Sequence, residues 1–172
     1  MKNDKKFEKV INFIIISLKN DMNAYELEDK VIALINQDES ILTVQDNFGM
    51  NLGMRAARFG LEKVVMRCLE KSEASVQQDQ MGWNIGMHAA MNKLEQATIK
   101  ALDNYEAALQ QDNNTENIGM HAAMNRLEQA VIKALENHDA ANQTDYDGRT
   151  IADIAKEKGL VKEDDEEQAE IA

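Results

Sequence analysis

Asn84–Leu102 reads NIGMHAAMNKLEQATIKAL, and almost the same sequence returns at Asn117–Leu135 as NIGMHAAMNRLEQAVIKAL. The two copies differ at two of nineteen positions, and their starting residue numbers differ by 33. A looser copy, NLGMRAARFGLEKVVMRCL, occupies Asn51–Leu69, at the same interval upstream. A fixed period of this length is typical of proteins that stack one structural unit on the next. The sequence therefore predicts a row of similar layers.

The same spacing extends to residues that precede each copy. An aspartate recurs at this interval, and the third residue after it is glycine in three of the four cases and threonine in the other. Aspartate and glycine at this separation favour a tight turn, because the aspartate side chain bonds the turn backbone. These positions are Asp46, Asp79, Asp112 and Asp145, followed by Gly49, Gly82, Thr115 and Gly148.

The period, the turns DNFG, DQMG, DNNT and DYDG, and the following N-[LI]-G-M-x-A-A segments together resemble the ankyrin repeat. The resemblance implies an all-α fold, an ankyrin-like repeat solenoid of stacked helix-turn-helix units joined by short finger turns. It departs from the family in having no proline. Asparagine stands where the family's threonine caps the inner helix, a role that asparagine also serves, and methionine stands where the family usually has histidine. These residues are Asn51, Asn84 and Asn117, with Met54, Met87 and Met120.

The resemblance implies one domain over residues 1–160. Residues 1–45 are expected to form a degenerate capping repeat with helices at Asp4–Lys19 and Ala24–Gln37, although basic residues before an apolar run also resemble a secretory signal. Three repeats at 46–78, 79–111 and 112–144, and a half repeat at 145–160, are expected to follow. The acidic tail, 161–172, has no periodicity, and we expect it to be disordered. Expected inner helices are Asn51–Phe59, Asn84–Asn92 and Asn117–Asn125, and expected outer helices are Leu61–Lys71, Leu94–Tyr105 and Leu127–His138.

Glycines within and after the predicted inner helices carry separate predictions. Glycine recurs inside each inner helix despite a cost of about 1 kcal/mol relative to alanine, which indicates close packing there. Gly60 suits the left-handed turn between the inner and outer helices. Where later copies have lysine or arginine instead, we expect the preceding asparagine to adopt that conformation. The residues concerned are Gly53, Gly86 and Gly119 inside the helices, and Asn92 and Asn125 at the turns.

Composition and charge exclude several classes of partner. The 19 lysines and arginines face 31 aspartates and glutamates, a net charge of −12, which argues against nucleic acid because phosphates require a basic surface. The apolar run Val10–Ile16 is too short to span a bilayer, so we expect no membrane partner. Cys68 is the single cysteine, is expected to be buried, and suits a reducing compartment such as the cytoplasm. We expect a monomer.

Two histidines are candidates for metal binding or catalysis. His88 and His121 lie one repeat apart, which would place them roughly 10 Å from each other, too far for one metal ion to bridge. Arg55 and Ile154 occupy the equivalent positions of other copies. The chain has no glycine-rich phosphate loop and no paired-cysteine metal motif. We therefore expect no catalytic residue, no metal site, no cofactor and no enzymatic activity.

Positions that the repeat pattern leaves free are the candidates for binding. In ankyrin-like arrays the finger tips and the exposed ends of the inner helices form the concave binding face, and here several of them are apolar or aromatic. Exposed apolar patches mark partner sites, and tryptophan is enriched at binding hot spots. Alternatively, Met91 and Met124 fill gaps between helices, and Trp83 lies in the core. The predicted binding residues are Phe48, Met50, Arg58, Phe59, Met81, Trp83, Met91, Asn92, Glu116, Met124, Asn125, Tyr146 and Arg149.

The sequence thus predicts a module that binds another protein without catalysis. One alternative is a secreted bacterial effector that uses its repeats to bind a host protein, because the glutamate-rich end resembles the export signals of type IV effectors. That protein would act inside a host cell. Another alternative is a small hydrolase or metal enzyme that uses His88 and His121.

Overall fold

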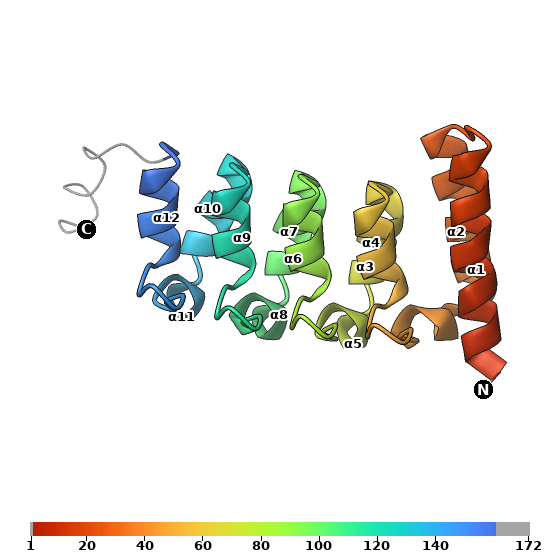
Figure 1. The fold of residues 1–172 in the computed structure, drawn as a ribbon, viewed down its shortest axis with the longest axis horizontal. Coiled ribbons are helices and arrows are strands. Elements are labelled where there is room, and N and C mark those ends of the chain that lie inside the picture. Colours follow the sequence, from red (N-terminus) through yellow and green to blue (C-terminus); the bar gives the residue numbers. More distant parts are fainter. Residues whose placement is uncertain (1, 161–172) are drawn as a thin grey trace.

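The computed structural model of the chain describes residues 2–160, and within them every regular element is a helix. The helices stand side by side in the order of the sequence, from the N-terminal pair at one end of the row to the last helix at the other (Figure 1). The prediction of an all-helical chain is confirmed. The predicted acidic tail, 161–172, lies outside the described residues, and its disorder stays a prediction.

The first layer consists of α1 (Lys2–Lys19) and α2 (Ala24–Gln37), followed by a 3₁₀ turn, η1 (Glu39–Thr43). Phe7, Val10 and Ile14 recur on one face of α1, and all three are buried. Asn23 begins α2, where its side-chain oxygen accepts a hydrogen bond from the backbone N–H of Tyr25. The predicted helical pair is thus confirmed. Over residues 2–160 no helix is both long enough and apolar enough to cross a membrane.

Each repeat contributes an inner helix whose start is fixed by its asparagine. The Asn84 side chain accepts a hydrogen bond from Met87 N at 3.1 Å and donates to Ala107 O at 3.0 Å, so that one residue caps its own helix and ties it to a later segment. The predicted capping by asparagine is confirmed, and Thr150 caps the last inner helix together with Asp153. The inner helices are α3 (Leu52–Arg58), α6 (Ile85–Met91), α9 (Ile118–Met124) and α12 (Ile151–Glu157).

The outer layer contains more helices than the sequence predicted. The long helix predicted to end at Tyr105 ends at Leu102, and Tyr105 instead begins a separate short helix. The cause is Asn104, whose side chain accepts the backbone N–H of Ala107 and starts a new helix in a new direction. The prediction of two helices per repeat is therefore wrong, because each repeat has three. The outer helices are α4 (Glu62–Leu69), α7 (Glu95–Leu102) and α10 (Glu128–Leu135), and the short ones are α5 (Ser72–Ser75), α8 (Tyr105–Leu109) and α11 (His138–Ala141).

The inner-helix glycines allow neighbouring layers to pack closely. A Cβ atom added at Gly86 would lie 2.5 Å from Ile118 Cδ1 in the next inner helix and 2.8 Å from Ala101 Cβ. Both separations are too short for carbon atoms, so an alanine there would force the layers to move. The expectation that packing requires the smallest residue is confirmed.

One prediction about the turns between inner and outer helices is wrong. Gly60 has a φ of 71°, as expected, but in the later copies Lys93 and Arg126 take the left-handed conformation, with φ of 58° and 62°. Asn92 and Asn125 keep negative φ values. Each asparagine side chain donates to the carbonyl of the histidine four residues earlier, which holds it in the helix and moves the turn to the next residue.

Cys68 is fully buried at the contact between α4 and the inner layer, as predicted. Burial raises the pKa of its thiol to about 12, because the thiolate would lose its hydration. The thiol therefore remains protonated at neutral pH and serves as a small apolar side chain.

Candidate functional site

The finger turns are fixed by their aspartates. The Asp79 Oδ1 oxygen accepts backbone N–H bonds from Met81 at 2.8 Å and Trp83 at 3.0 Å, and the aspartates of the other three fingers accept the equivalent pairs. The prediction that each aspartate bonds its own turn is confirmed. The finger tips are consequently held in one conformation.

In the first three fingers, the second oxygen of the aspartate anchors the finger to an inner helix. Asp79 Oδ2 accepts a bond from His88 Nε2 at 2.9 Å, and Asp112 Oδ2 accepts one from His121 Nε2 at 3.1 Å. Arg55 plays this part for the first finger. In the last finger, where the equivalent position is an isoleucine, the aspartate pairs with Arg149 of its own turn. The two histidines thus link their fingers to their inner helices.

Trp83 connects two repeats. Its indole Nε1 donates to Asp112 Oδ2 at 2.8 Å, and its ring meets the rings of His88 and His121 edge-on, with centroids 5.2 and 5.0 Å apart. The side chain is half-buried and packs against the core. The ring therefore does not project freely into solvent as the repeat pattern suggested, because its N–H bonds a carboxylate of the next finger.

Neighbouring fingers are joined by their backbones. Gln80 N donates to Phe48 O at 3.1 Å, and Asn113 N donates to Met81 O at 3.1 Å. Glutamines that the sequence reading did not single out add a second set of links, of which Gln78 Nε2 to Gln111 O, at 3.1 Å, is one. Their regular recurrence at Gln45, Gln78 and Gln111 was a signal that could have revealed them.

The structure distributes the thirteen predicted binding residues over three environments. Met50 is buried, so its assignment to an exposed face is wrong: it lies between the finger and the inner helix, where its sulfur accepts a bond from Arg58. Half-buried positions are Phe59, Trp83, Glu116, Met124, Asn125 and Arg149. The exposed ones are Phe48, Arg58, Met81, Met91, Asn92 and Tyr146, and these six are called the finger face below.

A hollow of about 420 Å³ lies within the finger face between the first two fingers. The exposed side chains of Phe48 and Met81 border it, together with Arg58 and the buried Met50. Arg55, which is already paired with Asp46, lies 5.5 Å from the centre of the Phe48 ring. Asp79, which is bonded to His88, also lines the hollow, so the hollow offers an apolar surface with the guanidinium of Arg58 at its border.

The fourth repeat gathers three possible metal ligands. Atoms of Asp112, Glu116 and His121 all lie within 4.8 Å of one another, and His121 Nε2 is 3.8 Å from Glu116 Oε2. However, Asp112 already accepts bonds from two backbone N–H groups, Trp83 and His121, and the same aspartate–histidine pair recurs one repeat earlier without a glutamate. The hydrogen bonds alone account for the arrangement.

Burial and charge shift the pKa values in this cluster. Burial raises the pKa of Asp112, but the hydrogen bonds from His121 and the backbone outweigh it, so the pKa lies below its usual value. For Glu116, burial raises the pKa, and the nearby carboxylates reinforce the shift although His121 opposes it. Burial lowers the pKa of His88, against the effect of Asp79. His88 is consequently neutral at pH 7.

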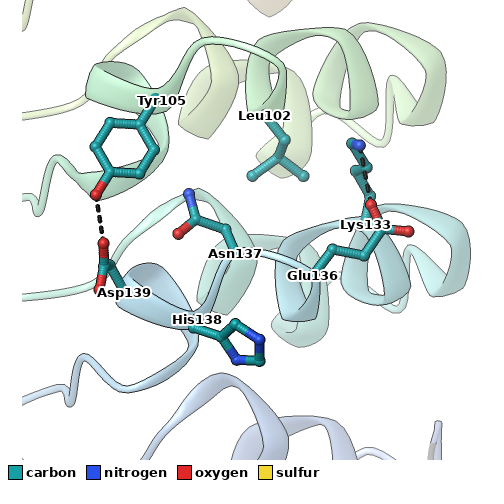
Figure 2. Close-up of a pocket in the computed structure, with 7 residues that line it drawn as sticks. All are labelled: Leu102, Tyr105, Lys133, Glu136, Asn137, His138 and Asp139. Carbon is teal, nitrogen blue, oxygen red and sulfur yellow. Dashed lines mark hydrogen bonds and ion pairs between the residues drawn. The ribbon is translucent and has the colours of Figure 1, made fainter.

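A second hollow of about 420 Å³ lies in the outer layer, between α8 and α11 (Figure 2). Tyr105 points toward Asp139 and donates a hydrogen bond to it, and Lys133 pairs with Glu136 at 2.9 Å. The Tyr105–Asp139 bond thus joins two repeats, whereas the Lys133–Glu136 pair lies within one, and both indicate a structural role. None of its lining residues was predicted as a site from the sequence, which has no motif there.

Comparison with models of known protein families finds no match, and comparison with curated proteins finds none either. The likeness to ankyrin repeats therefore rests on the sequence pattern.

Proposed function

We propose that this protein is an ankyrin-like repeat solenoid that binds a partner protein through its finger face and performs no catalysis. The repeat assignment is supported by the order of packing: α3 contacts α6, α6 contacts α9 and α9 contacts α12, and the outer helices α4, α7 and α10 follow the same order. Elements one repeat period apart are thus neighbours in space, as stacked repeats require.

The exposed apolar side chains of the finger face carry the functional proposal. Phe48, Met81 and Tyr146 are 63%, 55% and 76% exposed, at the tips of turns whose backbone N–H groups bond the finger aspartates. A fixed turn presents its side chains without a large entropic cost on binding. Large exposed apolar groups on such a scaffold are typical of protein-binding surfaces.

The hollow and the arginine at its border indicate which kind of partner segment would fit the finger face. Phe48 and Met81 border a recess wide enough for an apolar side chain, and Arg58 beside it favours a carboxylate. We expect the partner segment to combine an apolar residue with an acidic one, because both groups then meet complementary surfaces.

Affinity capture tests this proposal. The protein is immobilised in three forms, namely the wild type, a Phe48→Ala/Met81→Ala variant and a Tyr25→Ala control, and proteins retained from cell extract are quantified. Tyr25 is 69% exposed on α2, away from the finger face, so it matches the change in surface without touching the fingers. We expect a specific partner that the control retains and the finger variant loses.

Each captured partner is then measured with purified components. Loss of the two side chains should weaken its affinity by at least about tenfold, as truncation of hot-spot residues does. A partner that binds all three forms equally, or the absence of any specific partner, would contradict the assignment of the finger face.

A further inference from the structure

The first three finger turns are joined at their tips. The backbone N–H of Gln80 donates to Phe48 O, in the finger before it, at 3.1 Å. One repeat later, Asn113 donates to Met81 O at the same distance. The side-chain amides of these two residues add a second bond to each junction, to Asn47 O at 2.8 Å and to Gln80 O at 3.1 Å. The three turns therefore form one short ladder.

The tip of the last finger, residues 145–149, is not joined to the ladder in this way. Tyr146 occupies the position of Gln80 and Asn113, but within residues 2–160 its backbone N–H has no hydrogen-bond partner, and neither has the carbonyl of Asn114 across the junction. A tyrosine also lacks the side-chain amide that makes the second bond. The base of the finger remains tied to the third finger, through a bond from Gln111 Nε2 to Thr144 O at 3.2 Å. The last finger is thus attached at its base and separate at its tip.

The residue that is glycine in the other fingers explains this separation. A Cβ atom added at Gly82 would lie 2.9 Å from Asp112 Cα in the next finger, and one added at Gly49 would lie 3.0 Å from Asp79 Cα. Neighbouring fingers therefore pack against a residue that has no side chain. The third finger has Thr115 at this position, with the same left-handed backbone (φ of 61°). Its Cβ atom keeps the last finger from packing as closely as the earlier ones do.

The second junction has a further tie that the last one lacks. Trp83 joins the second finger to the third through its bond to Asp112. In the third finger the equivalent residue is Glu116, and an ionised carboxylate has no hydrogen to donate to Asp145. Among the described residues, the Glu116 side chain makes no hydrogen bond to the last finger.

The last finger is also anchored differently to its inner helix. In the second and third fingers a buried histidine of the inner helix bonds the finger aspartate, but here that position is Ile154, and Arg149 of the turn itself bonds Asp145. The Arg149 side chain reaches α12 through an exposed ion pair with Glu157, at 3.3 Å. Exposed pairs of this kind contribute little stability.

We propose that the last finger moves as a hinged flap, independently of the ladder formed by the other three, and that Thr115 is the residue that keeps the flap apart from the ladder. The turn keeps its own shape as it moves, because Asp145 accepts the backbone N–H groups of Asp147 and Arg149. The hinge lies at the base of the finger, beside Thr144.

The flap deepens the function proposed for the finger face, and its use in binding rests on that proposal. Phe48 and Met81 lie on the ladder, so they form the fixed part of the face. Tyr146 lies at the tip of the flap and is 76% exposed, so it forms the adjustable part. The tyrosine can therefore shift to meet a partner while the other two side chains keep their places.

Amide hydrogen exchange of the full, uncomplexed chain, followed residue by residue by NMR, tests the separation. Asn47 is the reference for an open tip, because no finger precedes it and its N–H has no partner within the described part of the chain. After correction for intrinsic rates, Tyr146 should exchange like Asn47. It should exchange at least about tenfold faster than Gln80 and Asn113, the factor that one ordinary hydrogen bond supplies.

Backbone order parameters test the motion. Gln80 and Asn113 should have values of about 0.85, those of rigid backbone, and Tyr146 should have a clearly lower value. A Tyr146 amide as protected as that of Asn113, or an order parameter equal to those of the ladder, would overturn the proposal.

Substitutions at the glycine position test the cause. Thr115→Gly should let the fingers close, so that Tyr146 exchanges at least about tenfold more slowly and approaches Asn113. Thr115→Ala is the matched control, because it keeps the Cβ atom and should leave Tyr146 fast. In the reciprocal variant, Gly82→Ala, a Cβ atom enters the ladder and Asn113 should lose its protection, whereas Gln80 should keep it and so report that the fold is intact.

Two results with the variants would also overturn the proposal. One is fast exchange of Tyr146 in Thr115→Gly, and the other is equally slow exchange in Thr115→Ala. All of these measurements use the free protein, whereas the binding role of the finger face is tested with Phe48→Ala/Met81→Ala. Failure of the flap and failure of the binding role are therefore distinguished.

Discussion

The indole N–H of Trp83 donates to the carboxylate of Asp112, in the next repeat along the chain, at 2.8 Å. Asp112 also holds the turn of its own finger and accepts a bond from His121. Trp83 therefore couples the finger of one repeat to the finger and inner helix of the next. It is the single tryptophan of the chain, so no other repeat makes this contact through an indole.

Replacement of Trp83 by phenylalanine removes this bond while keeping an aromatic ring. The free energy of unfolding should fall by about 1.5 kcal/mol or more, the usual contribution of a hydrogen bond to a charged acceptor. Urea denaturation measures the change, with Tyr146→Phe on the last finger as a control that should have no effect. An unchanged midpoint for the tryptophan variant would show that the bond does not couple the repeats.

Thr115 occupies the finger position at which the other three repeats have glycine. Its φ is 61°, a left-handed conformation that a β-branched residue adopts at a cost, and its buried hydroxyl has no hydrogen-bond partner. Thr115→Gly should therefore raise the free energy of unfolding by about 1 kcal/mol, which is the backbone strain of about 1–2 kcal/mol less the entropy that glycine loses.

Thermal or urea denaturation of Thr115→Gly checks this value. Gly148→Ala is the matched control, because Gly148 has a φ of 77° and open space around it, so backbone strain alone should destabilise the variant. A less stable Thr115→Gly protein would mean that the threonine side chain makes a favourable contribution of its own.

Replacement of Gly86 by alanine should lower the free energy of unfolding, although alanine has the higher helix propensity. Its added Cβ would meet Ile118 and Ala101, and overpacking of this kind costs about 1–3 kcal/mol, against a gain of about 1 kcal/mol in propensity. The expected net effect on chemical denaturation is a loss of stability. Ala152→Gly on the exposed face of α12 is the comparison, where glycine should be the less stable residue. A stabilised Gly86→Ala protein would refute the close packing of the inner helices.

His88 should make stability depend on pH. Burial lowers its pKa in the folded protein, so below about pH 6.5 the unfolded chain binds a proton that the folded chain does not. The free energy of unfolding should therefore decrease as the pH falls from about 7 toward the folded-state pKa, and level off below it. Denaturation midpoints at several pH values measure the slope.

His88→Gln should flatten this slope, because it removes the buried imidazole. Equal slopes in the wild type and His88→Gln would show that His88 is not the responsible group.

Features that depend on the local sequence pattern could be predicted from the sequence. Contacts with a residue that lies far away in the sequence could not. Apolar residues at helical spacing and a capping asparagine specify each inner helix within a few residues of chain, so these helices were found. The burial of Met50 was not, because it depends on Arg58 and on the packing of the finger against the helix. Nothing near Trp83 in the sequence identifies Asp112 as its acceptor. The short helices α5, α8 and α11 are one or two turns long, too short to show a helical period.

A glutamate of each layer accepts a backbone N–H at the start of the next outer helix. These glutamate caps make the repeating unit compatible with its own duplicate. Each unit arrives with an acid for the helix that follows, as Glu62 and Glu95 show, and with a leucine-capped helix that accepts an acid from the unit before. A copy inserted between two layers would therefore receive a cap and supply one. The near identity of Asn84–Leu102 and Asn117–Leu135 is what such an insertion would leave behind. By contrast, loss of the first layer would leave α4 without Glu28, so the row tolerates growth in its interior better than erosion at its N-terminal end.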